Sequence, residues 1–293
     1  MPEGKIIKAL SGFYYVLSGS DTIQCRGRGV FRKNKVTPLV GDYVTFQADN
    51  DKEGYIMEVQ TRKNELIRPP IANVDQAILV FSAKEPDFST LLLDRFLAIV
   101  EASGIEPLIC ISKIDLLDSR TRAEVDGYAR DYRAIGYEVL LISSETEEGI
   151  KQLRPYLAGK ISVFAGQSGV GKSSLLNAIQ PDLDLKTNGI SSHLGRGKHT
   201  TRHVELIETS SGLVADTPGF SSLDFTGIEM EELSALFPEM RRLSPDCKFR
   251  GCLHINEPKC AVKTAADAGD IPAYRYNHYE QFIQEIKDRK PRY

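Results

Sequence analysis

The chain has 293 residues, of which 41% are hydrophobic and 26% charged, and its formal net charge is −3. This length allows two or three domains with cores of their own, and the composition is ordinary for a soluble protein. No apolar run approaches the length of a membrane span, and the N-terminus lacks a signal-peptide pattern. We therefore expect a cytoplasmic protein with no membrane partner. The net charge gives no global nucleic-acid signature.

Residues 1–67 have the pattern of a small all-β domain. Short runs rich in β-branched and aromatic residues alternate with turns that contain Gly, Asp and Asn. These runs cover residues 13–17, 22–25, 43–46 and 55–59. Four or five short strands in this length predict an OB-fold barrel.

The first 40 residues are basic although the chain as a whole is acidic. They hold seven basic residues against two acidic ones, a net charge of +5, and four aromatic residues lie among them. This combination is typical of RNA-binding OB folds and predicts an RNA partner. A solvated basic face above core aromatics explains the same residues equally well. The residues concerned are Lys5, Lys8, Arg26, Arg28, Arg32, Lys33 and Lys35, with Phe13, Tyr14, Tyr15 and Phe31.

Residues 68–222 alternate apolar runs with segments of helical periodicity, which predicts a doubly wound α/β domain with its ligand loops at the carboxyl ends of the strands. The apolar runs are too continuous for strands exposed on one face and indicate a buried parallel sheet. The strands expected are 74–81, 107–112, 137–142 and 161–165, and the helices 91–102, 120–135 and 150–157.

A phosphate-binding loop occupies residues 166–173 of this domain. The segment matches G-x-x-x-x-G-K-[ST] at every fixed position, with a strand before it and the start of a helix after it. Its glycines let backbone N–H groups turn toward phosphate oxygens. We expect Lys172 to reach the β- and γ-phosphates and Ser173 to ligate Mg²⁺. The predicted contact residues are Gly166, Gln167, Ser168, Gly169, Val170, Gly171, Lys172, Ser173 and Ser174.

A predicted hairpin of residues 203–207 and 212–216 leads into a D-x-x-G sequence, from Asp216 to Gly219. In GTPases this carboxylate holds a Mg²⁺-bound water, and the glycine N–H senses the γ-phosphate. Residues 186–202 lie before the hairpin, are rich in glycine and lack periodicity, which predicts a first switch segment.

Two further loops point to guanine rather than adenine. Ser112, Lys113, Ile114 and Asp115 resemble the N/T-K-x-D motif, in which the carboxylate accepts from guanine N1–H and the exocyclic amine. Ser143 and Ser144 stand where the loop that closes over the base is expected, and we expect their backbone N–H groups to act there.

These motifs occur in an unusual order. The base-reading loops precede the phosphate loop, whereas ordinary GTPases have the phosphate loop first. This order predicts a circularly permuted GTPase, because the same sheet can form when the chain is cut at an exposed loop. The cut falls just after D-x-x-G, which forms the second switch segment of GTPases. The C-terminal segment is therefore joined directly to that switch.

The C-terminal segment carries Cys247, Cys252, His254 and Cys260 within fourteen residues. Three thiolates and one imidazole form a closed tetrahedral donor set, which predicts one structural Zn²⁺. Helices are expected at 230–237 and 274–286, and residues 287–293 as a frayed basic tail. We therefore divide the chain into an OB-fold RNA-binding domain (1–67), a circularly permuted GTPase domain (68–222) and a zinc-binding domain (223–293).

Taken together, these motifs resemble the circularly permuted GTPase family that depends on the small ribosomal subunit (RsgA, also called YjeQ or YloQ). The resemblance covers nearly the whole chain. It implies that GTP, bound with Mg²⁺, is hydrolysed to GDP and phosphate under stimulation by the 30S subunit. It also implies late maturation of that subunit, with rRNA contacts from the flanking domains. The first base-reading position departs from the family pattern, since it is Ser112.

We expect catalysis to depend on Lys172 of the phosphate loop and on His199 and Thr201 of the first switch segment. Phe220 follows D-x-x-G where many GTPases have a water-orienting Gln, so we expect slow intrinsic turnover, on the order of 10⁻³ s⁻¹. We expect His199 to reach the water when the partner binds, although an RNA-facing role is equally consistent. Either Thr200 or Thr201 is expected to meet Mg²⁺ and the γ-phosphate, with Thr201 preferred.

We also expect nucleotide state to move the zinc domain, because no linker separates it from the second switch. A monomer is expected. Three alternatives to a ribosome-assembly GTPase are a kinase, an RNA-binding module with a decayed nucleotide site, and an RNA-binding nucleotide switch outside ribosome assembly. A kinase needs an acceptor pocket, for which the sequence offers no candidate, and a decayed site is disfavoured because Lys172, Ser173 and Asp216 are all present.

Overall fold

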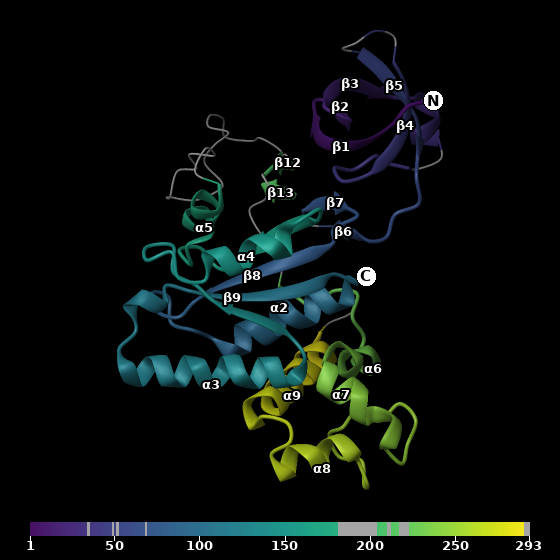
Figure 1. The fold of residues 1–293 in the computed structure, drawn as a ribbon. Helices are drawn as coiled ribbons and strands as arrows, with labels where there is room; N and C mark the ends of the chain where they lie inside the picture. Colours follow the sequence, from purple (N-terminus) through teal and green to yellow (C-terminus); the bar gives the residue numbers. More distant parts are fainter. Residues whose placement is uncertain are drawn as a thin grey trace.

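The computed structural model describes residues 1–33, 36–48, 50, 53–67, 69–180, 204–209, 212–216 and 223–289, and of residues 32, 67 and 216 only the backbone. The molecule is elongated, with a β-barrel at one end, a sheet flanked by helices in the middle and a group of helices at the other end (Figure 1). Among the described residues, no helix is long and apolar enough to cross a membrane.

The N-terminal part is a closed five-stranded barrel in the order β1-β2-β3-β5-β4, with β4 pairing back onto β1. Every pair is antiparallel except β3–β5. Closure leaves the ring without a free edge, and the buried side chains of all five strands fill its interior. The strands are β1 (Glu3–Leu10), β2 (Phe13–Ser18), β3 (Asp21–Gly27), β4 (Tyr43–Ala48) and β5 (Glu53–Val59), with a short helix α1 (Gly29–Lys33).

The predicted OB-type barrel is thus confirmed. The four predicted strand positions correspond to β2, β3, β4 and β5, while β1 was not identified individually from the sequence. Among the four aromatic candidates, Phe31 is buried in the core. The ring of Phe13, by contrast, lies 4.9 Å from the Arg26 guanidinium, and Tyr15 lies 6.0 Å from the Lys8 ammonium.

The central sheet has the order β10-β9-β8-β11-β13-β12. The first five strands are parallel and β12 is antiparallel to β13. Every residue of β8 is buried, as its continuous apolar sequence predicts. The strands are β8 (Gln76–Ser82), β9 (Glu106–Ser112), β10 (Glu138–Leu141), β11 (Ile161–Ala165), β12 (Glu205–Glu208) and β13 (Leu213–Asp216).

Two pairs of helices cover the two faces of this sheet. Leu79 and Phe81 of β8 belong to the core formed with α2 and α3, whereas Ile78 and Val80 belong to the core formed with α4 and α5. The helix boundaries follow their capping residues: Ser89 caps α2, Asp118 caps α3, and Gly136 ends α3 with φ 119°. The helices are α2 (Thr90–Ala102), α3 (Ser119–Ile135), α4 (Ile150–Leu157) and α5 (Lys172–Ile179).

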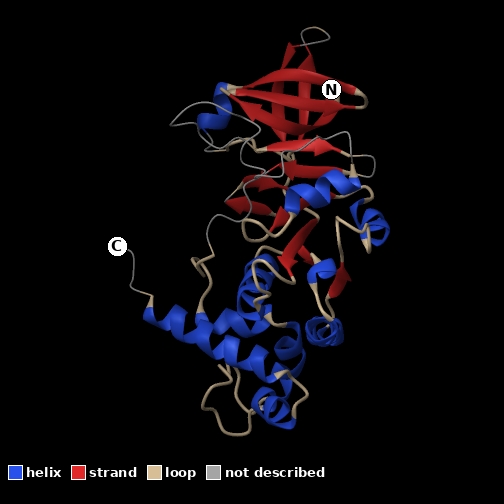
Figure 2. Ribbon diagram, turned by 90° about the vertical axis from the view of Figure 1, so that its left-hand side faces the viewer, coloured by secondary structure: helices blue, strands red, loops and turns tan. Residues whose placement is uncertain are grey.

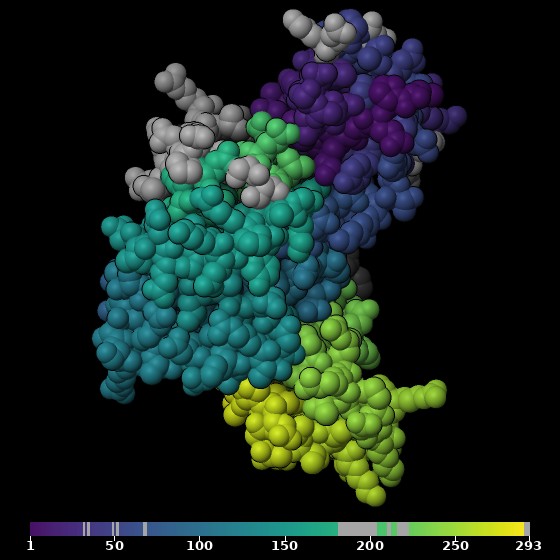
Figure 3. All heavy atoms as spheres, viewed as in Figure 1, coloured from purple at the N-terminus to yellow at the C-terminus, as the bar shows by residue number. Residues whose placement is uncertain are grey.

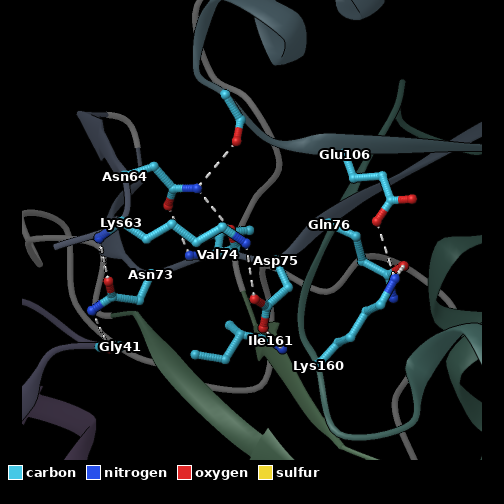
Figure 4. Close-up of polar contacts among 11 residues, drawn as sticks. Gly41, Lys63, Asn64, Asn73, Val74, Asp75, Gln76, Glu106, Lys160 and Ile161 are labelled. Carbon is cyan, nitrogen blue, oxygen red and sulfur yellow. Dashed lines mark hydrogen bonds and ion pairs between the residues drawn. The ribbon is translucent and has the colours of Figure 1, made fainter.

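Two asparagines organise the junction between the barrel and the central sheet (Figure 4). Asn64 pairs with the backbone N–H and C=O of Val74 at 2.9 and 2.8 Å. Asn73 accepts from Lys63 N at 2.8 Å and donates to Gly41 O at 3.0 Å. A short ribbon of β6 (Glu65–Ile67) and β7 (Pro70–Ala72) spans the same junction. The connection is therefore a hydrogen-bonded structure rather than a free linker.

The C-terminal part is helical, and Figure 2 shows its helices gathered below the strands of the barrel and sheet. The single helix expected at 230–237 is instead α6 followed by a 3₁₀ turn. Phe237 is extended and Pro238 starts the next helix, because a residue before proline disfavours the helical region. The helices are α6 (Met230–Leu233), α7 (Pro238–Leu243), α8 (Ala261–Ala268) and α9 (Ala273–Asp288).

A buried ionic cluster holds these helices against α2. Arg275 of α9 donates to Asp94 of α2 at 2.6 Å and to both carboxylate oxygens of Glu239 at 2.8 and 3.0 Å. His278 and Tyr132 also bond to Asp94, each at 2.6 Å. Burial alone would lower the pKa of Arg275, but the two carboxylates outweigh it and raise that pKa well above its ordinary value. The cluster joins the two parts through a fully charged guanidinium.

A second contact lies where the chain enters the C-terminal part. Arg95 of α2 donates to Leu223 O at 3.2 Å and forms a bidentate pair with Glu285 at 2.7 and 2.5 Å. Its guanidinium also lies 4.8 Å from the rings of both Phe225 and Phe282. Arg95 therefore fixes the first described residues after the D-x-x-G sequence onto the central domain.

Candidate nucleotide and metal sites

The phosphate-loop residues join the carboxyl end of β11 to the start of α5. Gly166, Gly169 and Gly171 have φ values of 143°, 82° and 92°, a region that side chains disfavour. A Cβ on Gly166 would lie 2.0 Å from Val80 O, so this position also requires glycine for lack of space. The loop thus has the conformation that turns successive N–H groups toward one point at the helix N-terminus.

Lys172 lies over this loop. Its ammonium donates to the carbonyl oxygens of Gly166 and Gln167 at 2.9 and 2.5 Å. Burial lowers the pKa of Lys172. Both partners are neutral, so phosphate oxygens would be stronger acceptors for the same ammonium. Ser173, the predicted Mg²⁺ ligand, is buried in the first turn of α5.

Ser112 links the base-reading loop to the phosphate loop. This buried residue ends β9, and its hydroxyl lies 2.6 Å from Val170 O and 3.2 Å from Phe81 O. A hydroxyl has one proton, so the shorter contact to Val170 is the hydrogen bond we assign. The departure from Asn or Thr at this position therefore keeps a donor that reaches the phosphate loop.

The side chain of Ser143 contacts Asp115, and the sequence did not predict this contact. Its hydroxyl donates to Asp115 Oδ1 at 2.5 Å and accepts from the N–H groups of Glu145 and Thr146 at 3.2 and 3.1 Å. Lys113, with φ 57°, starts the 3₁₀ turn that carries Asp115 and donates to Glu85 O. One Asp115 oxygen is thus fixed from the side, which orients the carboxylate.

These loops meet at one edge of the sheet. β9, β10 and β11 are parallel, so the loops that follow them all emerge at their carboxyl ends. The phosphate loop and the two base-reading loops are therefore brought together although they are reversed in sequence. This is the arrangement that a circular permutation of the GTPase fold requires.

The remaining predicted residues are only partly described. Asp216 ends β13, and its Cα partner in β12 is Glu205. This antiparallel pair is the hairpin predicted from the sequence. His199, Thr200, Thr201 and Gly219 lie outside the described residues.

The metal-binding candidates come together in the C-terminal part. The ligand atoms of Cys247, Cys252, His254 and Cys260 all lie within 4.8 Å of one another. The sulfurs of Cys247 and Cys260 are 3.8 Å apart, and His254 Nδ1 is 3.6 and 3.2 Å from them. A tetrahedral zinc ion with Zn–S bonds of about 2.3 Å places two sulfurs about 3.8 Å apart, so the residues fit the ion.

Residues outside the donor set orient the histidine and its loop. Ser244 Oγ lies 3.1 Å from His254 Nε2, which leaves Nδ1 for the metal. Tyr276 donates to His254 O at 2.6 Å, and the Glu257 carboxylate accepts from three backbone N–H groups of this loop. The donor spacing predicted the ligands, but it carried no signal for Ser244 or Glu257.

Comparison with known proteins agrees with this geometry. Residues 59–226 match the RsgA GTPase family and residues 3–56 match the RsgA N-terminal domain. Proteins from Bacillus velezensis and Bacillus subtilis, each named small ribosomal subunit biogenesis GTPase RsgA, are 68% and 67% identical over the full length of both chains.

Two solved structures share the fold over nearly the whole chain. The crystal structure of YloQ, described as a circularly permuted GTPase, is 62% identical with a TM-score of 0.87 and covers 100% of this chain and 97% of its own. YjeQ from Thermotoga maritima is 38% identical with a TM-score of 0.88, covering 99% of each chain. With its barrel, its permuted order of nucleotide loops and its Cys3His cluster, the chain belongs to the RsgA family of circularly permuted GTPases.

Proposed function

We propose that this protein hydrolyses GTP during late maturation of the small ribosomal subunit and that the 30S subunit stimulates the reaction. The observation that carries the proposal is the full-length identity of 67–68% to proteins named for that role. The convergence of the phosphate loop with both base-reading loops at one sheet edge supports GTP as the substrate.

In this proposal each nucleotide-binding loop has its own task. Backbone N–H groups of residues 166–174 and the Lys172 ammonium hold the phosphates, and Asp115 reads the guanine edge. Ser173, Thr201 and Asp216 would hold Mg²⁺ and its water, and Gly219 would meet the γ-phosphate. When bound, Mg²⁺ would supply charge neutralisation at the β- and γ-phosphates. The chain's contribution is therefore positioning and charge neutralisation rather than covalent chemistry.

The Cys3His cluster is assigned to one structural Zn²⁺. The protein supplies all four donors that a tetrahedral zinc ion takes, so no position would be left for a substrate. Of the four described helices in this part, α6, α7 and α8 have eight residues or fewer, and metal binding supplies stability that a small core lacks.

The barrel is the proposed rRNA-binding surface. Tyr43 and Tyr55 are exposed at 46% and 42%, and Lys5 lies 4.7 Å from the Tyr43 ring. Exposed aromatic rings beside cations are suited to base stacking and backbone contact. We further propose a cytoplasmic monomer that binds the subunit as a single chain.

The test is phosphate release from GTP and ATP by the purified, zinc-loaded protein with Mg²⁺. Three arms are compared: no ribosomal particle, purified small subunits, and purified large subunits. We expect GTP hydrolysis at least tenfold faster with small subunits than alone, with no hydrolysis of ATP. Equal stimulation by large subunits, or none by either, would contradict the proposed role.

A further inference from the structure

The barrel contacts the nucleotide domain through the hairpin that carries Asp216. Lys8 of β1 is the Cα partner of Glu205 in β12, and Glu205 is the Cα partner of Asp216 in β13. The three residues therefore stand in one row across three neighbouring strands. In Figure 3 the hairpin, in green, lies against the purple barrel.

An ion pair reinforces this backbone contact. Lys8 Nζ lies 3.0 and 2.9 Å from the two carboxylate oxygens of Glu205. The two side chains are only 30% and 36% exposed, so water screens the pair incompletely. Only strand β12 therefore separates Lys8 of the barrel from Asp216, the first residue of D-x-x-G.

The hairpin needs such support from outside. β12 and β13 have four residues each, and β12 is the last strand of the central sheet before the barrel. A short strand at a sheet edge has one unpaired side and is held weakly. On its other side, β13 pairs in parallel with β11, which runs into the phosphate loop. The barrel thus adds to a continuous row of paired strands that ends at β11, which precedes the phosphate loop.

We propose that Lys8 is a positioning residue for GTP hydrolysis: through Glu205 it fixes the hairpin and hence the position of Asp216 relative to the phosphate loop. The inference rests on the proposed role of Asp216 at the magnesium-bound water. It makes the seating of the barrel a determinant of turnover, through the strands that connect Lys8 to Asp216.

The test compares Lys8→Glu, Glu205→Lys and the charge-swapped double variant by GTP hydrolysis without ribosomal particles. We expect each single variant to lose about three- to fivefold in kcat with KM for GTP unchanged, the range that a partly exposed ion pair can transmit. The double variant should recover at least half of the loss, because the pair is restored in reverse.

Arg241→Glu is the control. Arg241 pairs with Glu101 at 3.3 Å where the C-terminal helices meet α2, so this substitution reverses one charge of an ion pair away from the barrel and the hairpin and should leave kcat unchanged. Melting temperatures of all variants distinguish positioning from loss of fold, and we expect them within a few degrees of the parent protein. Single variants with parental or raised kcat, or a double variant without recovery, would overturn the inference. Absence of GTP hydrolysis in the parent protein would instead reject the proposed function.

Discussion

Arg275 in the C-terminal helices donates a hydrogen bond of 2.6 Å to Asp94 of the central domain, and neither side chain is more than 1% exposed. The pair joins residues that are 181 positions apart in the chain. It is the centre of the cluster that holds the two parts together. Removing one member of such a pair leaves a buried charge without its partner.

Arg275→Met should therefore lower the free energy of unfolding by about 3 to 5 kcal/mol, because Asp94 and Glu239 lose their common cation. Urea denaturation followed by circular dichroism measures the change. Arg241→Met is the matched control at the same interface. Arg241 pairs with Glu101 at 3.3 Å but is 55% exposed, so its loss should cost less than about 1 kcal/mol. Equal effects of the two substitutions would contradict the role of burial.

Ser143→Ala should weaken guanine-nucleotide binding about tenfold, because Asp115 loses the hydroxyl that orients it. The measurement is the Kd for GDP by titration calorimetry. Ser144→Ala serves as the control, since we expect only its backbone N–H to act and the substitution keeps that group. A larger effect at Ser144 than at Ser143 would show that the loop acts differently.

Lys172→Met should abolish GTP hydrolysis, with kcat reduced at least a hundredfold, because no other cation of the phosphate loop can take its place. Stability should not fall. The pKa of Lys172 is lowered by burial, which means that the folded protein disfavours this charge. Melting temperature and single-turnover hydrolysis are measured on the same sample. A marked drop in melting temperature would assign Lys172 a structural role instead.

Chelation of the metal should unfold the C-terminal helices. We expect one zinc per chain by elemental analysis, and Cys260→Ser should lose it together with helical signal, because metal binding stabilises these helices. The serine hydroxyl can still cap α8 as Cys260 does, so the loss reports on the metal. Cys110→Ala is the control, because Cys110 is buried in the central sheet away from the cluster. Zinc retained in Cys260→Ser, or lost in Cys110→Ala, would contradict the assignment.

His199→Ala should remove the stimulation by small subunits while leaving GTP affinity unchanged, if His199 reaches the attacking water. The experiment compares hydrolysis rates at saturating subunit concentration. His203→Ala gives a control of the same residue type four positions along the chain. Stimulated turnover equal to that of the parent protein would leave His199 with a role other than catalysis.

Much of the fold followed from local sequence. The apolar runs of β8, β9 and β11 and the capped helices between them were predicted to within a few residues, since burial and capping are local properties. The motifs likewise identified the loops, because phosphate and guanine recognition require fixed residue types. β1 was not identified, since its lysines interrupt the apolar alternation expected of a strand.

The contacts between loops could not be predicted. Ser112 reaches Val170, and Ser143 reaches Asp115, only because the strand order places their loops together. Asp94 interrupts an apolar run from Leu91 to Val100, which was a signal for a buried charge, but its partner lies in a separate part of the chain. Sequence periodicity carries no information about such pairing.

Nucleotide-dependent movement of the C-terminal helices stays a prediction. Arg95 and Arg275 both tie these helices to α2, and separating them would expose the carboxylates of Asp94 and Glu239. A movement that keeps this interface must carry α2 with it. Distances between labels on α2 and α9, measured with GDP and with a GTP analogue, distinguish separation of the two helices from a movement that carries them together.

The junction between the barrel and the sheet has a consequence for work with fragments. Ile71 is 0% exposed, and it bridges Val40 in the loop before β4. Its neighbour Asn73 donates to Gly41, so the barrel depends on residues that follow its last strand. A barrel expressed only to residue 67 would lack Ile71 and Asn73, and the apolar side chains that pack around Ile71 would be exposed to water. Binding studies on isolated pieces therefore require a fragment that extends through Val74.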